Sequence, residues 1–332
     1  MVQMGVQIVM DQVNLLISFS LPASYVERIR AVSTRVTILQ SRDEQEALAL
    51  AKDADILLAG FFSPELFKAT KRLKWIQTLF AGVDAFLYPE VVKSSVVITN
   101  AGGVNSIPVS EQVVGMMLCL NRKLHLFMRN QTERKWKTSD MDLIFRMEEL
   151  SGKTAGIVGL GRIGSEIAKK AKCLGMRVIA ARRNPSAPKP DYVDKIVSPE
   201  NLEELLADSD FVIIQIPLTK DTQGMLGEKQ LRRMKPTAYL VNASRGDVIK
   251  EDELIKALKE GWIAGAALDT FATEPLPEDS PLWDMTNVII TPHVAGLTPR
   301  YMERLTDLFC ENLRRFLNGE SLINVVDKTR GY

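Results

Sequence analysis

Short runs of apolar residues alternate with longer amphipathic stretches along almost the whole chain. In the first hundred residues, the apolar runs predict buried strands at 13–19, 36–39, 55–59, 75–79 and 96–99. The stretches between them have the spacing of amphipathic helices, for example at 23–32 and 44–52, and Ser63-Pro64 has the residue types of a helix cap and first turn. Strands separated by helices predict βαβ units and therefore a parallel sheet.

A second series of the same kind follows the turn signal Asn100-Ala101-Gly102-Gly103. We expect a long helix at 108–126, then strands at 154–158, 177–181, 211–216, 238–241, 263–268 and 288–290, and a final helix at 299–317. Because the second series ends near residue 297, the final helix is expected to return to the first domain. The pattern thus predicts two α/β domains, residues 1–105 with 298–332 and residues 106–297, with a cleft between them.

Composition and charge argue against several classes of protein. The 332 residues include 42 Lys and Arg against 41 Asp and Glu, so the chain lacks the basic excess of a nucleic-acid-binding protein. No stretch reaches the ~18–20 apolar residues of a membrane-spanning helix, and the N-terminus lacks the basic start of a signal peptide. Three widely spaced cysteines and two histidines indicate neither a disulfide framework nor a metal site. We expect a cytoplasmic protein without a metal, a membrane anchor or a nucleic-acid partner.

The six residues from Gly159 to Gly164 match the pattern G-x-G-x-x-G. The pattern is weak by itself, but here it follows a predicted strand and opens a predicted helix at 163–174. In that setting Gly159 permits a tight turn, Gly161 lets the backbone approach a pyrophosphate, and Gly164 lets helix and strand pack closely. Free N–H groups at the helix N-terminus would bind the phosphates. We therefore predict a dinucleotide site; the alternative is a glycine-rich turn without a ligand.

The end of the next predicted strand bears on the choice of dinucleotide. Domains that prefer NAD carry an Asp or Glu there, about 20 residues after the glycines, to bond the ribose 2′-OH. Here the segment reads Ala180-Ala181-Arg182-Arg183-Asn184, without an acidic residue. Two guanidinium groups can bind a 2′-phosphate through charge-assisted hydrogen bonds. The segment predicts NADP(H) as the preferred cofactor, with NAD(H) second; the alternative is a solvated pair of basic residues.

Polar residues follow three further predicted strands, at the edge where parallel sheets bind ligands. They are Arg245, Asp269, Glu274 and His293. Hydride transfer to a ketone leaves an alkoxide that must be protonated, and a histidine suits that task. A neighbouring carboxylate favours the charged imidazolium, and an arginine can bind a substrate carboxylate bidentately. The structural alternatives are that Arg245 pairs with Asp247, that Glu274 is loop surface, and that His293 only stabilises the fold.

Several stretches together resemble the D-isomer-specific 2-hydroxyacid dehydrogenases over nearly the whole chain. Besides the glycine motif they are Ala81-Gly82-Val83-Asp84, Val109-Ser110-Glu111, Leu150-Ser151-Gly152-Lys153-Thr154, Glu274-Pro275-Leu276-Pro277, and residues 242–246, 265–269 and 292–296. The resemblance implies two Rossmann-like, doubly wound parallel-sheet domains with the active site between them. Residues 1–105 with 298–332 would be a flavodoxin-like substrate domain. Residues 106–297 would bind the dinucleotide and form a homodimer.

The same resemblance implies roles for individual residues. His293 would be the general acid/base with Glu274 as its partner, and Arg245 would bind the substrate carboxylate and carbonyl. Asp269 would contact the nicotinamide carboxamide. The loop residues implied in substrate binding are Phe80, Ala81, Gly82 and Val83. The other residues implied in the cofactor pocket are Gly159, Gly161, Arg162, Ile163, Gly164, Arg182, Arg183, Pro217, Ala243 and Gly296.

Three positions need separate interpretation. Gln215 stands where many family members have a histidine, and Phe80 is bulkier than the usual small or polar residue. His125, on the predicted helix at 108–126, is interpreted as structural or as part of a subunit contact. The arginine pair resembles that of NADPH-dependent glyoxylate/hydroxypyruvate reductases, so an NADP-dependent reductase of small 2-oxo acids is expected. A second hypothesis is a dinucleotide-sensing corepressor similar to the C-terminal binding proteins, which would need only to bind the dinucleotide.

Overall fold

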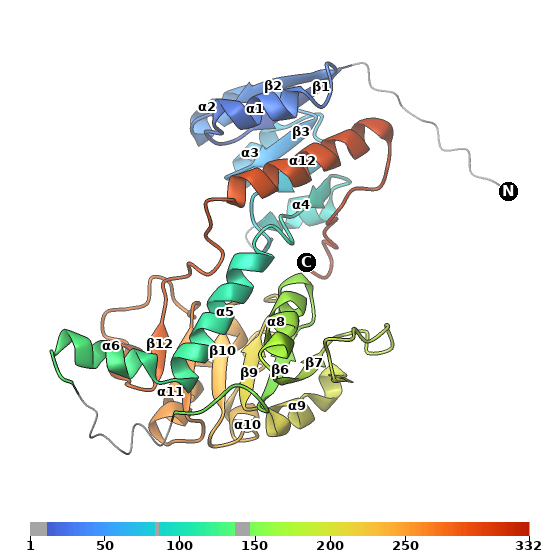
Figure 1. Ribbon diagram of the computed structural model, residues 1–332. Coiled ribbons are helices and arrows are strands. Elements are labelled where there is room, and N and C mark those ends of the chain that lie inside the picture. Colours follow the sequence, from blue (N-terminus) through green and yellow to red (C-terminus); the bar gives the residue numbers. More distant parts are fainter. Residues whose placement is uncertain (1–11, 84–85, 137–146, 332) are drawn as a thin grey trace. The chain divides into compact units, whose positions relative to one another are not determined.

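The computed structural model describes residues 12–83, 86–136 and 147–331. Its contacts divide the chain into two units, one made of residues 1–105 and 298–332 and the other of residues 106–297. Each unit is built around a parallel sheet with helices on both faces (Figure 1). The predicted α/β class, with two doubly wound parallel sheets, is therefore confirmed. Asp84, which belongs to one of the family-like motifs, lies outside the described residues.

The sheet of the first unit has the strand order β2-β1-β3-β4-β5, which is the flavodoxin-like order. Its strands are β1 (Val13–Ile17), β2 (Val36–Gln40), β3 (Ile56–Ala59), β4 (Trp75–Thr78) and β5 (Val97–Thr99). The helices α1 (Ala23–Arg30) and α12 (Tyr301–Asn318) pack on one face. The other face is covered by α2 (Glu44–Leu50), α3 (Pro64–Ala69) and α4 (Pro89–Lys93).

Burial on both faces explains why the strands of this unit read as continuous apolar runs. In β1, residues 13, 15 and 17 pack in one cluster with Phe309 and Leu313 of α12. Leu16, which points to the opposite face, packs in a second cluster with Leu66 of α3. The final helix therefore supplies one of the two layers that cover the first sheet, although it follows the second unit in the chain.

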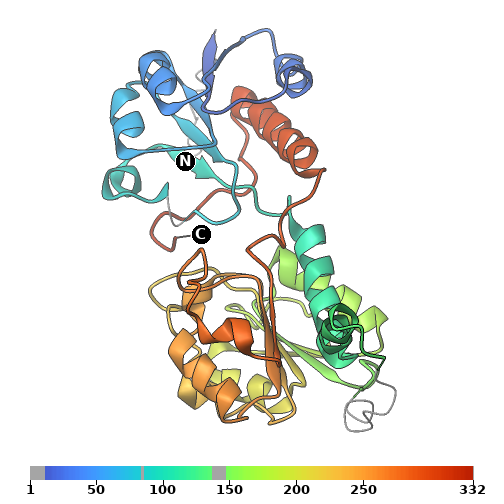
Figure 2. The same ribbon diagram turned by 90° about the vertical axis from the view of Figure 1, so that its left-hand side faces the viewer.

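The sheet of the second unit has seven parallel strands in the order β12-β11-β10-β9-β6-β7-β8. They are β6 (Thr154–Val158), β7 (Arg177–Ala181), β8 (Lys195–Val197), β9 (Phe211–Ile214), β10 (Tyr239–Asn242), β11 (Gly265–Leu268) and β12 (Val288–Ile290). The helices α5 (Ser106–Asn121) and α8 (Arg162–Cys173) cover one face, and α9 (Leu202–Asp208), α10 (Glu228–Leu231) and α11 (Glu251–Lys259) cover the other (Figure 2). The strand order reverses between β6 and β9, which is where such folds bind ligands.

The predicted helix at 108–126 is wrong in one respect, because it is interrupted. α5 ends at Asn121, Lys123 adopts a left-handed φ of 57°, and a separate helix α6 runs from Leu124 to Thr132. The Asn121 amide donates to the carbonyl of Glu148, and the Lys123 ammonium donates to the phenol of Tyr239. These contacts fix the chain at the break. The apolar spacing continues across it, so the pattern alone indicated one helix.

Other features of the sequence can be placed on this fold. Among the described residues, no helix is long and apolar enough to cross a membrane, and no group of His, Cys, Asp and Glu is arranged to hold a metal ion. The three cysteines are free thiols. His125 lies on α6, where its Nδ1 is 3.2 Å from the Cys119 carbonyl oxygen and burial lowers its pKa.

Candidate active site

The glycine loop connects β6 to α8 at the point where the strand order of the second sheet reverses. Gly159 has a left-handed φ of 107°, and a Cβ there would lie 2.2 Å from the Gln215 carbonyl oxygen at the end of β9. A Cβ on Gly164 would lie 2.1 Å from the Gly159 carbonyl oxygen. Only glycine fits at these two positions, because a side chain would collide with backbone.

The middle glycine of the loop differs from the other two. A Cβ on Gly161 would have nothing within 4 Å, so packing within the protein does not require a glycine there. Gly161 is the N-cap of α8, and no side chain caps that helix. Open space in front of uncapped N–H groups fits a pyrophosphate. The nearby Gln215 amide nitrogen is buried and, among the described residues, has no hydrogen-bond partner. The loop therefore fits a dinucleotide.

The two arginines after β7 have different surroundings. Arg182 is half-buried, and its Nη2 donates to the carbonyls of Ala187 and Pro188, the latter at 3.2 Å. These bonds fold the following loop back onto the strand end. Arg183 is exposed. Of the two guanidinium groups, that of Arg183 is therefore the more accessible to a 2′-phosphate, whereas Arg182 also shapes the loop.

An imidazole–carboxylate pair lies beyond β11 and β12. His293 Nδ1 is 2.7 Å from Glu274 Oε2, and 47% of the His293 side chain is exposed. The second oxygen, Glu274 Oε1, accepts the N–H of Phe271 at 3.0 Å, which fixes the carboxylate. Because Nδ1 faces the carboxylate, Nε2 is the ring nitrogen left to meet a substrate. This is the arrangement of an oriented acid or base.

A buried carboxylate holds the loop that carries His293. Asp269 is 1% exposed, and its two oxygens accept the N–H groups of Val294 and Ala295, each at 3.0 Å. The hydroxyl of Thr291 also donates to Asp269. Three donors from one short segment clamp it on the end of β11. The sequence analysis identified Asp269 as a polar residue at the end of a strand. No motif predicted that its side chain bonds to the loop that carries His293.

Arg245 is positioned by its own loop and by the loop before Glu274. Asn242 accepts the N–H of Ser244 at 3.1 Å and donates to the Arg245 carbonyl at 3.0 Å, so the chain turns tightly after β10. A Cβ on Gly246 would lie 1.9 Å from the carbonyl carbon of Phe271. The backbones of the two loops therefore touch. This contact brings the Arg245 loop beside the segment that carries Glu274.

The predicted substrate loop of the first unit follows β4. The Phe80 side chain is 50% exposed, and its ring centroid is 6.2 Å from that of Phe86. Ala81 and Gly82 are half-buried, and Val83 is 1% exposed. The loop thus presents backbone and an aromatic ring, in contrast to the charged groups of the second unit.

The remaining predicted cofactor residues lie on the second unit, near the same strand ends. Ile163 is half-buried and Arg162 exposed in the first turn of α8. Ala243 follows β10, Gly296 follows the His293 segment, and the Pro217 carbonyl accepts the hydroxyl of Thr222 at 2.7 Å. Their positions agree with a dinucleotide that runs along this edge of the sheet, and their individual contacts stay predictions.

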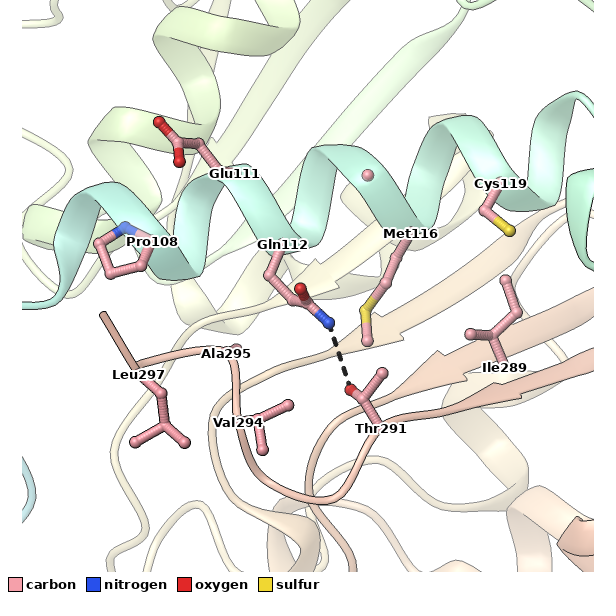
Figure 3. A pocket seen from close by; sticks show the side chains of 11 residues that line it. Pro108, Glu111, Gln112, Met116, Cys119, Ile289, Thr291, Val294, Ala295 and Leu297 are labelled. Carbon is pink, nitrogen blue, oxygen red and sulfur yellow. Dashed lines mark hydrogen bonds between the residues drawn. The ribbon is translucent and has the colours of Figure 1, made fainter. Parts of the chain in front are cut away.

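A groove of about 480 Å³ lies between α5 and the segment that contains Thr291 and Leu297 (Figure 3). Gln112 of α5 donates to the Thr291 hydroxyl across it at 3.4 Å. Its other lining residues are Pro108, Glu111, Gly115, Met116, Cys119, Ile289, Val294 and Ala295. The groove is lined by neither the imidazole–carboxylate pair nor the glycine loop, so it is separate from the residues predicted to act in catalysis.

Comparisons with known proteins agree with this geometry. Residues 114–295 match the family model of the D-isomer specific 2-hydroxyacid dehydrogenase NAD binding domain. A glyoxylate reductase of Korarchaeum cryptofilum is 38% identical over 284 residues, which cover 83% of this chain and 84% of the relative. A D-isomer specific 2-hydroxyacid dehydrogenase family protein of Aeromonas salmonicida has a similar structure, with a TM-score of 0.83, 32% identity, and coverage of 96% of this chain and 99% of that one.

A second solved structure is an NADPH-dependent glyoxylate/hydroxypyruvate reductase of Sinorhizobium meliloti in complex with NADP and sulfate. It gives a TM-score of 0.82 at 26% identity and covers 97% of this chain and 100% of that one. The family resemblance inferred from the motifs is confirmed. The chain belongs to the D-isomer specific 2-hydroxyacid dehydrogenases, which transfer a hydride between a nicotinamide dinucleotide and a 2-oxo or 2-hydroxy acid.

Proposed function

We propose that this enzyme is an NADP(H)-dependent reductase of small 2-oxo acids, with glyoxylate and hydroxypyruvate as its substrates. The observation that carries the proposal is the pair of His293 and Glu274, with 2.7 Å between Nδ1 and Oε2 and the imidazole half-exposed. A protein that only sensed the dinucleotide would not need an oriented proton donor at this edge. The pair favours catalysis over the corepressor hypothesis.

In the proposed reaction, each residue acts on one part of the substrate. The reduced nicotinamide, when bound, supplies a hydride to the carbonyl carbon. His293 Nε2 donates a proton to the carbonyl oxygen, so that one hydride and one proton convert the C=O bond to an alcohol. Glu274 stabilises the imidazolium before transfer and fixes the ring orientation. Arg245 binds the substrate carboxylate and polarises the carbonyl.

The preference for NADP(H) rests on the segment after β7. No acidic side chain stands at the strand end, and Arg183 is exposed beside it. The fold of the loop is fixed by Arg182 through the carbonyls of Ala187 and Pro188. We assign contact with the 2′-phosphate chiefly to Arg183. The NADP complex of the Sinorhizobium meliloti reductase supports the choice by similarity.

We also propose that the enzyme is a homodimer formed through the second unit. None of the described residues of α6 is buried, and its Leu124 and Met128 are 46% and 63% exposed. Trp136, a few residues further on, is 91% exposed. Exposed apolar side chains that recur within one short stretch of the chain are typical of a protein contact. Light scattering of the Met128→Lys variant should show a smaller mass than the parent, whereas Lys71→Glu on the first unit should not.

The decisive experiment follows the absorbance of NADPH with glyoxylate and hydroxypyruvate as separate substrates, and with NADH for comparison. Turnover that is faster with NADPH supports both the reaction and the cofactor assignment. Turnover with NADH alone would agree with the proposed role of His293 but would reject the assignment of the 2′-phosphate contact to Arg183. Binding of NADPH without turnover of any 2-oxo acid in a wider panel would contradict the reductase and favour the sensor.

A further inference from the structure

In the loop after β4, the backbone carbonyls and the backbone N–H groups differ in their hydrogen bonding. Among the described residues, the N–H groups of residues 80–83 have no hydrogen-bond partner. The carbonyls at the start of the loop are bonded instead. The Leu79 carbonyl accepts the phenol of Tyr301, and the Phe80 carbonyl accepts the N–H of Ala101 at 2.9 Å and the hydroxyl of Thr78 at 2.8 Å.

Because the peptide group is planar, these carbonyl bonds determine where the N–H groups of the loop point. A trans peptide is planar, and its C=O and N–H bonds point in opposite directions. The Leu79 carbonyl and the Phe80 N–H belong to one peptide group, so a bond that holds the carbonyl also aims the N–H the other way. The same holds for the Phe80 carbonyl and the Ala81 N–H. Two consecutive donors are therefore aimed away from the protein groups that hold the loop.

Tyr301 is well placed to hold the first of these peptide groups. It is the first residue of α12, which is fixed on the sheet by Leu305 and Phe309 in the same apolar cluster as Leu79. Burial raises the pKa of Tyr301 to about 12, so the phenol keeps its proton and acts as a donor at neutral pH. A helix that is packed on the sheet thus supplies the phenol that holds the Leu79 carbonyl.

We propose that Tyr301 is a positioning residue that orients the Phe80 N–H toward the carboxylate of the 2-oxo acid. The inference rests on the proposed function and adds a residue from the last helix to its substrate site. Tyr301 does not touch the substrate; it acts through the Leu79–Phe80 peptide group. The selectivity of the site for a carboxylate then depends on a side chain more than 200 positions away in sequence from the loop.

The test compares Tyr301→Phe with Tyr88→Phe. Both variants lose one phenol that donates to a carbonyl in the first unit, because Tyr88 donates to Phe62 at 2.9 Å. We expect Tyr301→Phe to raise the KM for glyoxylate about fivefold, the worth of one hydrogen bond, with kcat and the KM for NADPH unchanged. Tyr88→Phe should leave all three constants at the parent values. Equal effects of the two variants, or a loss in kcat alone, would overturn the proposal.

A second measurement does not depend on turnover. In protein labelled with ¹⁵N-phenylalanine, the Phe80 amide signal is assigned by its loss in Phe80→Leu. Tyr301→Phe should shift this signal and lower its order parameter, whereas Tyr88→Phe should do neither. An unchanged Phe80 amide in Tyr301→Phe would reject the inference even if the reductase is confirmed. If the parent enzyme reduces no 2-oxo acid, the proposed function fails, and the amide signal alone decides whether Tyr301 orients the peptide group.

Discussion

The two units present different chemistry at the same edge of the same kind of sheet. Beyond the strands of the second unit lie ionisable side chains that bond to one another, with His293 held by Glu274 and its loop held by Asp269. Beyond β4 of the first unit lie the ring of Phe80 and backbone N–H groups that have no partner in the part of the chain that the structure describes. One parallel-sheet architecture thus carries an imidazole–carboxylate pair in one unit and a neutral loop in the other. Substitutions of His293 and Glu274 should lower kcat, and those in the loop after β4 should change the KM for the 2-oxo acid and substrate choice.

The largest effect is expected for His293→Asn. Loss of the proton donor should lower kcat for reduction about 10²–10⁴-fold. His293 has a left-handed φ of 52°, a conformation that asparagine tolerates well, so the free energy of unfolding should change by less than about 1 kcal/mol. Steady-state kinetics and urea unfolding check the two parts. A kcat within tenfold of the parent would remove His293 from proton transfer.

Glu274→Gln should have the next largest effect. The amide keeps an oxygen near the imidazole but no longer stabilises its charged form, so kcat at neutral pH should fall roughly ten- to hundredfold. The measurement is the steady-state kcat at saturating cofactor and glyoxylate. A kcat equal to the parent value would show that Glu274 only supports the loop.

Arg183→Ala tests the proposed contact between the second unit and the 2′-phosphate of NADPH. Loss of a charge-assisted bond should raise the KM for NADPH about tenfold and leave that for NADH unchanged. Arg182→Ala is the matched variant, and it should weaken both cofactors, because Arg182 also bonds to the loop carbonyls. If Arg182→Ala alone discriminates between the two cofactors, the assignment of the 2′-phosphate moves to Arg182.

Phe80→Ala addresses the first unit. The ring is half-exposed on the loop proposed to bind the substrate, so its removal should raise the relative kcat/KM for a bulkier 2-oxo acid over glyoxylate by about fivefold. The kcat for glyoxylate should stay near the parent value, because the backbone donors remain. Competition between glyoxylate and phenylpyruvate measures the ratio. A loss of kcat for both substrates would contradict a division of tasks between the units.

The smallest effect concerns stability at alkaline pH. Burial raises the pKa of Tyr301 to about 12 and that of Cys310 to about 11, and both lie on α12. The folded state holds these protons more tightly than the unfolded state, so the stability is intact below the ordinary values and is lost as pH rises through the folded-state values. The loss falls between about pH 9 and 12. Urea unfolding should show a shallower alkaline decline for Tyr301→Phe than for the parent.

The sequence predicted the framework better than the contacts that complete the site. Strands that are buried on both faces leave continuous apolar runs, and the positions of Gly159 and Gly164 follow from backbone collisions that only glycine avoids. The α/β class followed from the apolar runs, and the family followed from the resemblance of several motifs together. The three-residue strand β8 had too short a run to be recognised.

What the sequence did not reveal depends on side chains that bond to distant backbone. The break after Asn121 involves the carbonyl of Glu148, and the clamp on the His293 loop involves both oxygens of Asp269. Arg182 was predicted to bind the 2′-phosphate together with Arg183, and it also bonds to its own loop. Such bonds depend on which loops lie close together in the folded chain. Neither apolar spacing nor local motifs predict which loops these are.

The contact between Gly246 and Phe271 has a consequence for recombining this chain with its relatives. Since the two backbones touch, the loops of Arg245 and Glu274 should come from the same parent sequence in a chimaera. A chimaera whose crossover falls between residues 246 and 271 would join loops that were shaped for different partners. Crossovers at residues 105 and 297 together would transfer both loops intact with the whole second unit. Libraries that exchange whole units should therefore retain active members more often than libraries that cut within the second unit.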